Sequence, residues 1–356
     1  MRIVQLIDSL ETGGAEQMAV TYANTLAQHI AFSGLIATRK EGDLKMQLAP
    51  NVHYRFLARK RTIDFKALFA FRRYVIENKV TIVQAHSSSF LLAVLLKLVY
   101  PKIKIVWHDH YGNSEFLAQR KAGVLKIASF LFFRVIVVNH QLLEWGKNNL
   151  YCKKIVYLPN FTGERQKEEA TTFLNGNEGK RIVCLANLRP QKNHMLLLEV
   201  AQQLKRKHPD WSFHLVGKDF EDSYSETIRK SITERQLQDT VFMYGSRQDV
   251  SNILKQSAIG VLTSKSEGLP VALLEYGFHK LPVVVTNVGE ISSILTKENG
   301  LLIEDLNAAA FLSAICNLIE DVNLRTKLSA NLNRTVLEKY AEKAILEDYF
   351  TLLNEQ

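Results

Sequence analysis

The chain has 356 residues with an apolar content of 47%, so it is long enough for two domains and can fill two cores. Its three cysteines (Cys152, Cys184 and Cys316) stand singly, which argues against disulfides and zinc sites and indicates a reducing compartment. The net charge of +9 comes from residues 1–165, where 23 Lys and Arg outnumber 11 Asp and Glu, but zinc-finger, basic-zipper and RRM motifs are missing, which argues against nucleic acid as a partner.

Short β-branched runs alternate with helix-length amphipathic segments along the first half. The predicted strands are residues 3–7, 33–37, 53–56, 81–85, 103–107, 135–138 and 155–158. Helical patterns include residues 15–29 and 65–78. In the second of these we expect one apolar face to point inward, made of Phe65, Leu68, Phe69, Phe71 and Val75 with Arg72. This alternation predicts a parallel sheet with right-handed crossovers.

A polar, glycine-containing stretch at residues 160–180 interrupts the pattern, and we interpret it as an interdomain linker. A second series of strands follows, at residues 181–186, 212–216, 240–243, 258–263, 282–286 and 301–303, with helices such as 195–206 and 224–236 between them. The predicted fold class is therefore α/β, with two doubly wound Rossmann-like domains at 1–165 and 166–338. We expect a C-terminal helix at 339–356 to pack back toward the first domain, and a ligand cleft between the domains at the carboxyl ends of both sheets.

The N-terminal run lacks the apolar core and cleavage site of a signal peptide, and no apolar stretch reaches the ~20 residues that span a bilayer. We therefore expect a cytoplasmic protein. Its basic first half suits peripheral attachment to the anionic inner face of the cell membrane, or phosphorylated acceptors, although an ordinary solvated basic surface is the alternative.

The most informative segment is residues 264–277, where an apolar strand passes into a helix. Gly268 lets the backbone approach a ligand closely, and Pro270 suits the first helical position. The N-terminus of such a helix is a phosphate site, so Glu267 is expected near a phosphate or sugar and Glu275 near a ribose diol. We expect neither glutamate in the core. The alternative is two solvated acids flanking an ordinary amphipathic helix.

This segment resembles the family 4 glycosyltransferases, whose Glu-x7-Glu signature matches Glu267 and Glu275 with Gly268, Leu269 and Pro270 between them. The resemblance covers nearly the whole chain. It implies the GT-B fold and a retaining, hexosyltransferase-type transfer of a sugar from a nucleotide diphosphate donor. It also implies that Glu275 binds the donor ribose and that Glu267 lies beside the donor sugar and phosphates.

Residues 185–194 resemble the family's Gly-Arg-Leu…Lys loop, whose Arg and Lys neutralise the donor diphosphate. Lys192 matches the family lysine, whereas Ala186-Asn187 replaces Gly-Arg and Arg189 lies two positions later, either taking that role or lying solvated near a helix start. Two cations would stabilise the leaving diphosphate without a metal. The Asp-x-Asp motif of metal-dependent GT-A enzymes is missing, so we expect no metal and no cofactor.

Other candidate residues follow predicted strands. Gly13 and Gly14 resemble the family's Gly-Gly-Ala-Glu loop near the donor sugar, although on their own they suit any tight turn. The family often carries a histidine after the strand at 103–107, which selects His110 first and His108 second. His108-Asp109-His110 is alternatively part of a metal site, for which the sequence names no third ligand. The remaining candidates are His86, which is as readily structural, and Gly245 and Ser246, in the region that contacts the nucleotide base.

Together these features predict catalytic roles for His110, Glu267, Arg189 and Lys192. The predicted donor is a UDP-linked sugar, and the predicted acceptor is a glycan or lipid-linked molecule of cell-envelope polysaccharide synthesis. Two alternatives stay open. A GT-B nucleotide-sugar epimerase would turn over the donor without an acceptor, and a non-catalytic nucleotide-sugar-binding protein would show no turnover.

Overall fold

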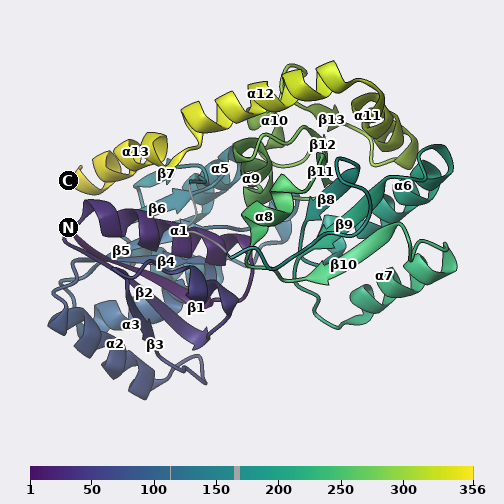
Figure 1. Cartoon of the computed structure of the whole chain (residues 1–356). Coiled ribbons are helices and arrows are strands. Elements are labelled where there is room, and N and C mark those ends of the chain that lie inside the picture. The colour runs from purple at the N-terminus through teal and green to yellow at the C-terminus, as the bar shows by residue number, and fades with distance from the viewer. Residues whose placement is uncertain (113, 164–168, 356) are drawn as a thin grey trace. The chain divides into compact units, whose positions relative to one another are not determined.

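The computed structural model describes residues 1–112, 114–163 and 169–355, and it divides the chain into two compact units (Figure 1). Unit 1 comprises Met1–Asn160 together with the C-terminal residues from Leu346 onward, and unit 2 comprises Phe161–Ile345. The ligand cleft between the two domains stays a prediction.

Unit 1 contains a sheet of parallel strands in the order β3-β2-β1-β4-β5-β6-β7. Every strand predicted for the first half is present. The bounds are β1 (Arg2–Ser9), β2 (Phe32–Lys40), β3 (His53–Phe56), β4 (Ile82–His86), β5 (Lys104–Asp109), β6 (Arg134–Val137) and β7 (Ile155–Tyr157).

Helices cover both faces of this sheet. They are α1 (Gly14–His29), α2 (Phe65–Glu77), α3 (Phe90–Val99), α4 (Gly123–Ala128) and α5 (His140–Asn149), with α13 (Glu342–Asn354) at the chain's end. Helices α2 and α3 pack on the face that carries Val4 and Leu6 of β1. Helix α1 packs on the opposite face, beside Ile7.

The inward face predicted for α2 is wrong for two of its aromatic residues. Leu68, Phe71 and Val75 are buried, whereas Phe65 and Phe69 are 67% and 57% exposed. Because successive residues of a helix turn by about 100°, the two phenylalanines lie on a second stripe beside the buried one. Ile76, also exposed, continues that stripe, so α2 presents apolar side chains to solvent.

Unit 2 contains a second parallel sheet, ordered β10-β9-β8-β11-β12-β13. The six strands predicted for the second half are present as β8 (Arg181–Leu185), β9 (Ser212–Val216), β10 (Val241–Gly245), β11 (Ile259–Leu262), β12 (Val283–Thr286) and β13 (Leu301–Ile303). Two parallel sheets with alternating helices confirm the predicted fold class.

The helices of unit 2 also lie on both faces of their sheet. Those on one face are α6 (His194–Lys207), α7 (Ser223–Glu234) and α11 (Ala308–Glu320). Those on the other are α8 (Val250–Lys255), α9 (Val271–Phe278), α10 (Ile291–Ile294) and α12 (Val322–Lys339). Among the described residues, every helix is too short or too polar to cross a membrane.

Much of the stretch interpreted as a linker packs on unit 2. Residues 164–168 lie outside the described residues. Beyond them, the backbone N–H groups of Thr171 and Thr172 donate to Asp249 Oδ2 at 2.8 and 2.7 Å, and Leu174 is buried in the core. The stretch from Thr171 to Leu174 is therefore held by side chains of the second sheet's helices and loops.

Candidate active site

Two loops of unit 2 lie against each other where β8 and β11 end. These strands are neighbours in the sheet, so the loops that follow them, residues 186–193 and 263–270, emerge side by side. The backbone N–H of Lys265 donates to Gln191 O at 2.7 Å, and Thr263 Oγ1 donates to Lys192 O at 3.0 Å. The structure thus brings together two of the segments that the sequence predicts for donor binding.

The central contact of these loops joins a predicted cation to a predicted carboxylate. Lys192 Nζ lies 2.6 Å from Glu267 Oε1, and Ser264 Oγ donates to the same oxygen at 2.6 Å. The side chain of Glu267 is 7% exposed and that of Lys192 is 23% exposed. Because both side chains are largely shielded from solvent, this charge-assisted hydrogen bond holds Lys192 and Glu267 in fixed positions.

Helix α9 begins one residue later than predicted. Pro270 is its N-cap residue, and the helix starts at Val271. Proline supplies no side-chain acceptor for the first N–H groups of the helix, so an anion is a suitable partner for them. The loop after β12 also contacts this segment. Gly289 has φ +59°, and a Cβ there would lie 2.3 Å from Glu267 O, so only glycine fits against the Glu267 backbone.

Both glutamates of the segment are buried, which makes the expectation that neither lies in the core wrong. Glu267 and Glu275 are each 5% exposed. Thr162 Oγ1 lies 3.4 Å from Glu275 Oε1, and the pair is buried. The sequence did not show this because Thr162 is far from Glu275 along the chain.

A pocket of about 420 Å³ lies at the carboxyl ends of β8, β9 and β10. Gly217 and Gly245 line it, and a Cβ at Gly217 would lie 2.2 Å from Ala186 O. The predicted base-contacting residue Gly245 is therefore in this pocket, and Ser246 follows it. Arg189 is exposed, and its guanidinium carbon lies 3.9 Å from the centroid of the Phe220 ring.

In unit 1, the two predicted glycines begin helix α1. Gly13 is the N-cap residue, and Gly14 is the first residue of the helix. A Cβ at Gly14 would meet nothing within 4 Å, so the backbone of Gly14 borders open space. A ligand can therefore approach the backbone closely at Gly14.

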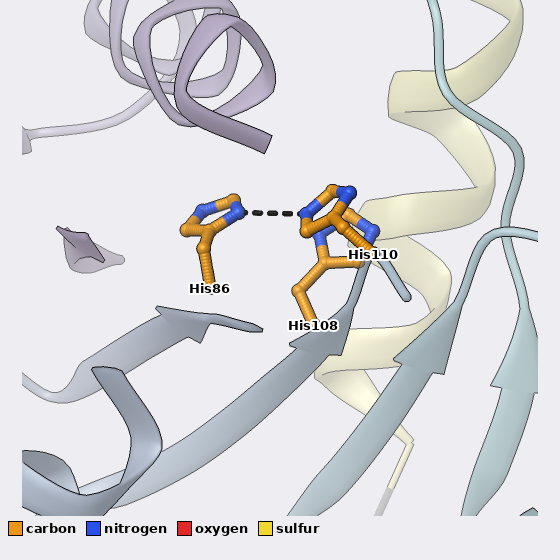
Figure 2. A group of neighbouring side chains, drawn as sticks. All are labelled: His86, His108 and His110. Carbon is orange, nitrogen blue, oxygen red and sulfur yellow. Dashed lines mark hydrogen bonds between the residues drawn. The ribbon is translucent and has the colours of Figure 1, made fainter. Parts of the chain in front are cut away.

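Three histidines cluster where β4 and β5 end, on the face of the sheet opposite α2 and α3 (Figure 2). His86 Nδ1 lies 2.9 Å from His110 Nε2, and the His108 ring centroid is 4.0 Å from that of His110. His86 and His108 are fully buried, whereas His110 is partly exposed. Of the three, His110 is thus the one open to a ligand.

The cluster is held in the neutral state. Burial lowers the pKa of His110 to about 3 and the pKa values of His86 and His108 well below their usual range. One nitrogen from each ring lies within 4.8 Å of the others, so His86 is the third ligand that the metal alternative lacked. The arrangement can therefore hold a sugar hydroxyl or, alternatively, a transition-metal ion.

Sequence reasoning missed the residues that support this cluster. Gln5 and Gln84 are fully buried and contact His86 and His108. The buried Tyr349 hydroxyl donates to Gln84, and Arg120 pairs with Asp109 at 2.6 and 2.9 Å. A signal for the glutamines was available. Both follow Ile-Val within a mostly apolar predicted strand, at residues 3–7 and 81–85, and a polar residue inside a buried parallel strand needs a partner.

Two family models match the chain. Residues 12–162 match the model described as Glycosyltransferase Family 4, and residues 166–335 match the model described as Glycosyl transferases group 1.

Glycosyltransferases of three bacteria are similar to 72–96% of this chain. An uncharacterized glycosyltransferase of Haemophilus influenzae is 24% identical over 350 residues, 96% of each chain. The UDP-Gal:alpha-D-GlcNAc-diphosphoundecaprenol alpha-1,3-galactosyltransferase of Escherichia coli is 26% identical over 75% of this chain and 74% of its own. The poly(ribitol-phosphate) alpha-N-acetylglucosaminyltransferase of Staphylococcus aureus is 29% identical over 72% of this chain and 50% of its own.

Solved structures share the fold. Sucrose-phosphate synthase from Thermosynechococcus elongatus has a TM-score of 0.80 at 17% identity, covering 99% of this chain and 98% of that one. The Anabaena protein HepE, solved in complex with UDP and glucose, has a TM-score of 0.79 at 15% identity and full coverage of both chains. The predicted GT-B fold is confirmed.

Proposed function

Since this chain belongs to the group 1 glycosyltransferases and has the GT-B fold, we propose that it transfers a hexose-type sugar from a UDP-linked donor to a glycan or lipid-linked acceptor of the cell envelope, with retention of configuration. The observation that carries this proposal is the Lys192–Glu267 pair beside the N-terminus of α9. A cation, a carboxylate and helix N–H groups thus lie on two adjoining loops. The cation and the N–H groups suit a diphosphate, and the carboxylate suits the attached sugar.

The diphosphate binds at these loops. Lys192 and the first N–H groups of α9 neutralise its charge, and Arg189 adds a second cation from the loop after β8. Charge on the diphosphate increases as the sugar leaves, so positively polarised groups fixed beforehand lower the barrier. Glu267 lies at the same place and contacts the donor sugar or its phosphate.

The nucleoside occupies the neighbouring region of unit 2. The pocket of about 420 Å³ is large enough for a base, and Glu275 holds the ribose diol. Uracil is the base we favour, because the HepE structure contains UDP and the galactosyltransferase relative takes UDP-Gal.

Transfer proceeds on one face of the sugar. The bond between the anomeric carbon and the diphosphate oxygen breaks, and a bond from the acceptor oxygen to the same carbon forms. The acceptor oxygen attacks the anomeric carbon directly, so the reaction needs no protein nucleophile, and the hydroxyl proton passes to the leaving phosphate oxygen. We assign to His110 a contact with a hydroxyl of the donor sugar. The cationic groups do the work of a metal, and the enzyme acts without one.

The acceptor reaches the enzyme at a membrane. Phe65, Phe69 and Ile76 form the exposed stripe of α2, with Lys66 and Arg73 exposed on the same helix. Apolar side chains next to cations suit an anionic lipid surface, and the basic first half adds long-range attraction. The galactosyltransferase relative acts on a lipid diphosphate, which supports this choice.

A donor screen tests the proposal. Thermal unfolding with UDP-, GDP- and dTDP-sugars should show the largest stabilisation with a UDP-sugar, because ligands that bind only the folded state raise its stability. The selected donor is then incubated with and without lipid-linked and glycan acceptors. Turnover that needs an acceptor supports transfer, epimerised donor without an acceptor identifies an epimerase, and tight binding with no turnover identifies a binding protein.

A further inference from the structure

Two buried glutamines hold two histidines of the cluster. Gln5 of β1 and Gln84 of β4 are directly opposite each other in the sheet, and both are fully buried. Gln5 Oε1 lies 2.8 Å from His86 Nε2, and Gln84 Nε2 lies 2.9 Å from His108 Nδ1. The Tyr349 hydroxyl donates to Gln84 Oε1 at 2.5 Å. Each glutamine therefore supports a different ring.

These contacts determine which nitrogen of each ring carries the proton. A carbonyl oxygen only accepts, so the proton of His86 lies on Nε2, toward Gln5. The other nitrogen of a neutral imidazole is an acceptor, so His86 Nδ1 receives the N–H of His110 Nε2, 2.9 Å away (Figure 2). The lone pair of neutral His110 is then on Nδ1.

We infer that Gln5 and His86 are positioning residues that hold His110 as the Nε2–H tautomer, with Nδ1 as the acceptor for a hydroxyl of the reacting sugar. This rests on the proposed function, because it requires His110 to contact that sugar. The opposite tautomer presents an N–H at Nδ1, which cannot accept a hydroxyl proton. Gln5 thus acts on the reaction from the middle of β1, through His86.

A metal ion held between His86 Nδ1 and His110 Nε2, the two nitrogens that face each other, is incompatible with this arrangement. Both nitrogens would need lone pairs for the ion, so the hydrogen bond between them would be lost. The two arrangements predict different proton positions on His110, which can be observed directly.

The first experiment measures those positions without any substrate. Long-range ¹H–¹⁵N spectra of protein labelled with ¹⁵N-histidine distinguish the two tautomers. We expect the Nε2–H form for His110 in the wild type, and a mixture of forms in His86→Phe and Gln5→Met. The control is Gln84→Met, which removes an equally buried amide from the opposite strand and should change the His108 signals only. If His86→Phe does not fold, the same spectra of Gln5→Met provide the test.

The second experiment separates positioning from stability. His86→Phe should lower kcat about 10- to 100-fold with little change in the KM for the donor, since supporting partners of functional histidines act on this scale. His86→Asn, whose Oδ1 can replace the Nδ1 acceptor, should recover most of the loss. If His86 had only a structural role, His86→Phe and His86→Asn would lower kcat to the same extent.

Three results would overturn the inference: an Nδ1–H form of His110 in the wild type, an unchanged tautomer and kcat in His86→Phe, or stoichiometric zinc binding that shifts all three histidines. Failure of the proposed function gives a different pattern. No donor would be turned over by the wild type, and the tautomer spectra would still decide whether Gln5 and His86 orient His110.

Discussion

Lys192 Nζ lies 2.6 Å from Glu267 Oε1, and this contact joins the loop after β8 to the loop after β11. The carboxylate neutralises the cation that we assign to the donor diphosphate. We therefore expect a bound diphosphate to compete with Glu267 for Lys192.

Lys192→Ala should lower turnover about 100- to 1000-fold, the loss expected when one group that stabilises transition-state charge is removed. Steady-state kinetics with the selected donor measures it. Lys205→Ala is the matched control, because Lys205 is also ion-paired in unit 2, to Asp239 at 2.5 Å, but on the surface away from these loops. Near-normal kinetics of a folded Lys192→Ala variant would remove Lys192 from the site.

Replacing Glu275 and replacing Glu267 should have different effects on the reaction. We assign Glu275 to the donor ribose, a contact that would be the same before and during reaction, so its replacement should chiefly weaken donor binding. Replacement of Glu267 should chiefly lower the chemical rate. Calorimetric donor titration and single-turnover kinetics of Glu275→Gln and Glu267→Gln separate these effects. Because both carboxylates are buried and hydrogen-bonded, we also expect lower melting temperatures in both variants. Weak donor binding in Glu267→Gln with normal binding in Glu275→Gln would reverse our orientation of the nucleotide.

Activity should not require a divalent metal. In our proposal Lys192 and Arg189 supply the charge that a metal would supply, so turnover in excess EDTA should match turnover in untreated enzyme. A loss of activity that magnesium, manganese or zinc restores would contradict this prediction. Restoration by zinc alone would indicate a metal site at the three histidines.

Stability should fall as the pH is lowered from about 6.5 toward 4. Burial lowers the pKa of His110 and of His214 to about 3, and that of His194 to about 4. Below pH 6.5 the unfolded chain binds protons that the folded chain does not, so the free energy of unfolding decreases until the folded values are reached. Urea unfolding across this range measures the slope. His214→Gln should make it shallower, and an unchanged slope would show that His214 titrates normally.

Membrane binding should depend on both charge and the exposed stripe of α2. Flotation with anionic vesicles should recover the protein at low salt and less of it at high salt, since salt screens exposed charges. The double variant Phe65→Ser/Phe69→Ser should float poorly. Phe173→Ser, which alters an exposed phenylalanine of unit 2, should float like the wild type. Equal recovery on neutral and anionic vesicles would refute an electrostatic contribution.

The arrangement of strands was predictable because parallel strands buried on both faces are short apolar runs bounded by polar turns. Strands β3, β9 and β13 have the predicted ends, and the other strands differ by a few residues. The face of α2 was not predictable. A helix of thirteen residues with apolar side chains on two stripes gives no local sign of which stripe meets the sheet.

For the site, local segments were predictable and the contacts between them were not. The sequence identified Lys192 and Glu267 separately, and their pairing depends on β8 and β11 being neighbours in the sheet. Burial of Glu275 beside Thr162, and support of His108 by Gln84 and Tyr349, likewise depend on residues far apart in the chain. Propensity and spacing carry no information about such pairs.

Unit 1 is assembled from two distant parts of the chain, and this has a consequence for biosynthesis. Tyr349 is fully buried against Tyr22, with ring centroids 5.1 Å apart, and contacts Gln84. During translation the residues from Leu346 onward leave the ribosome after all of unit 2. The part of unit 1 that is synthesised first therefore leaves Tyr22 and Gln84 without their partner Tyr349 until α13 emerges.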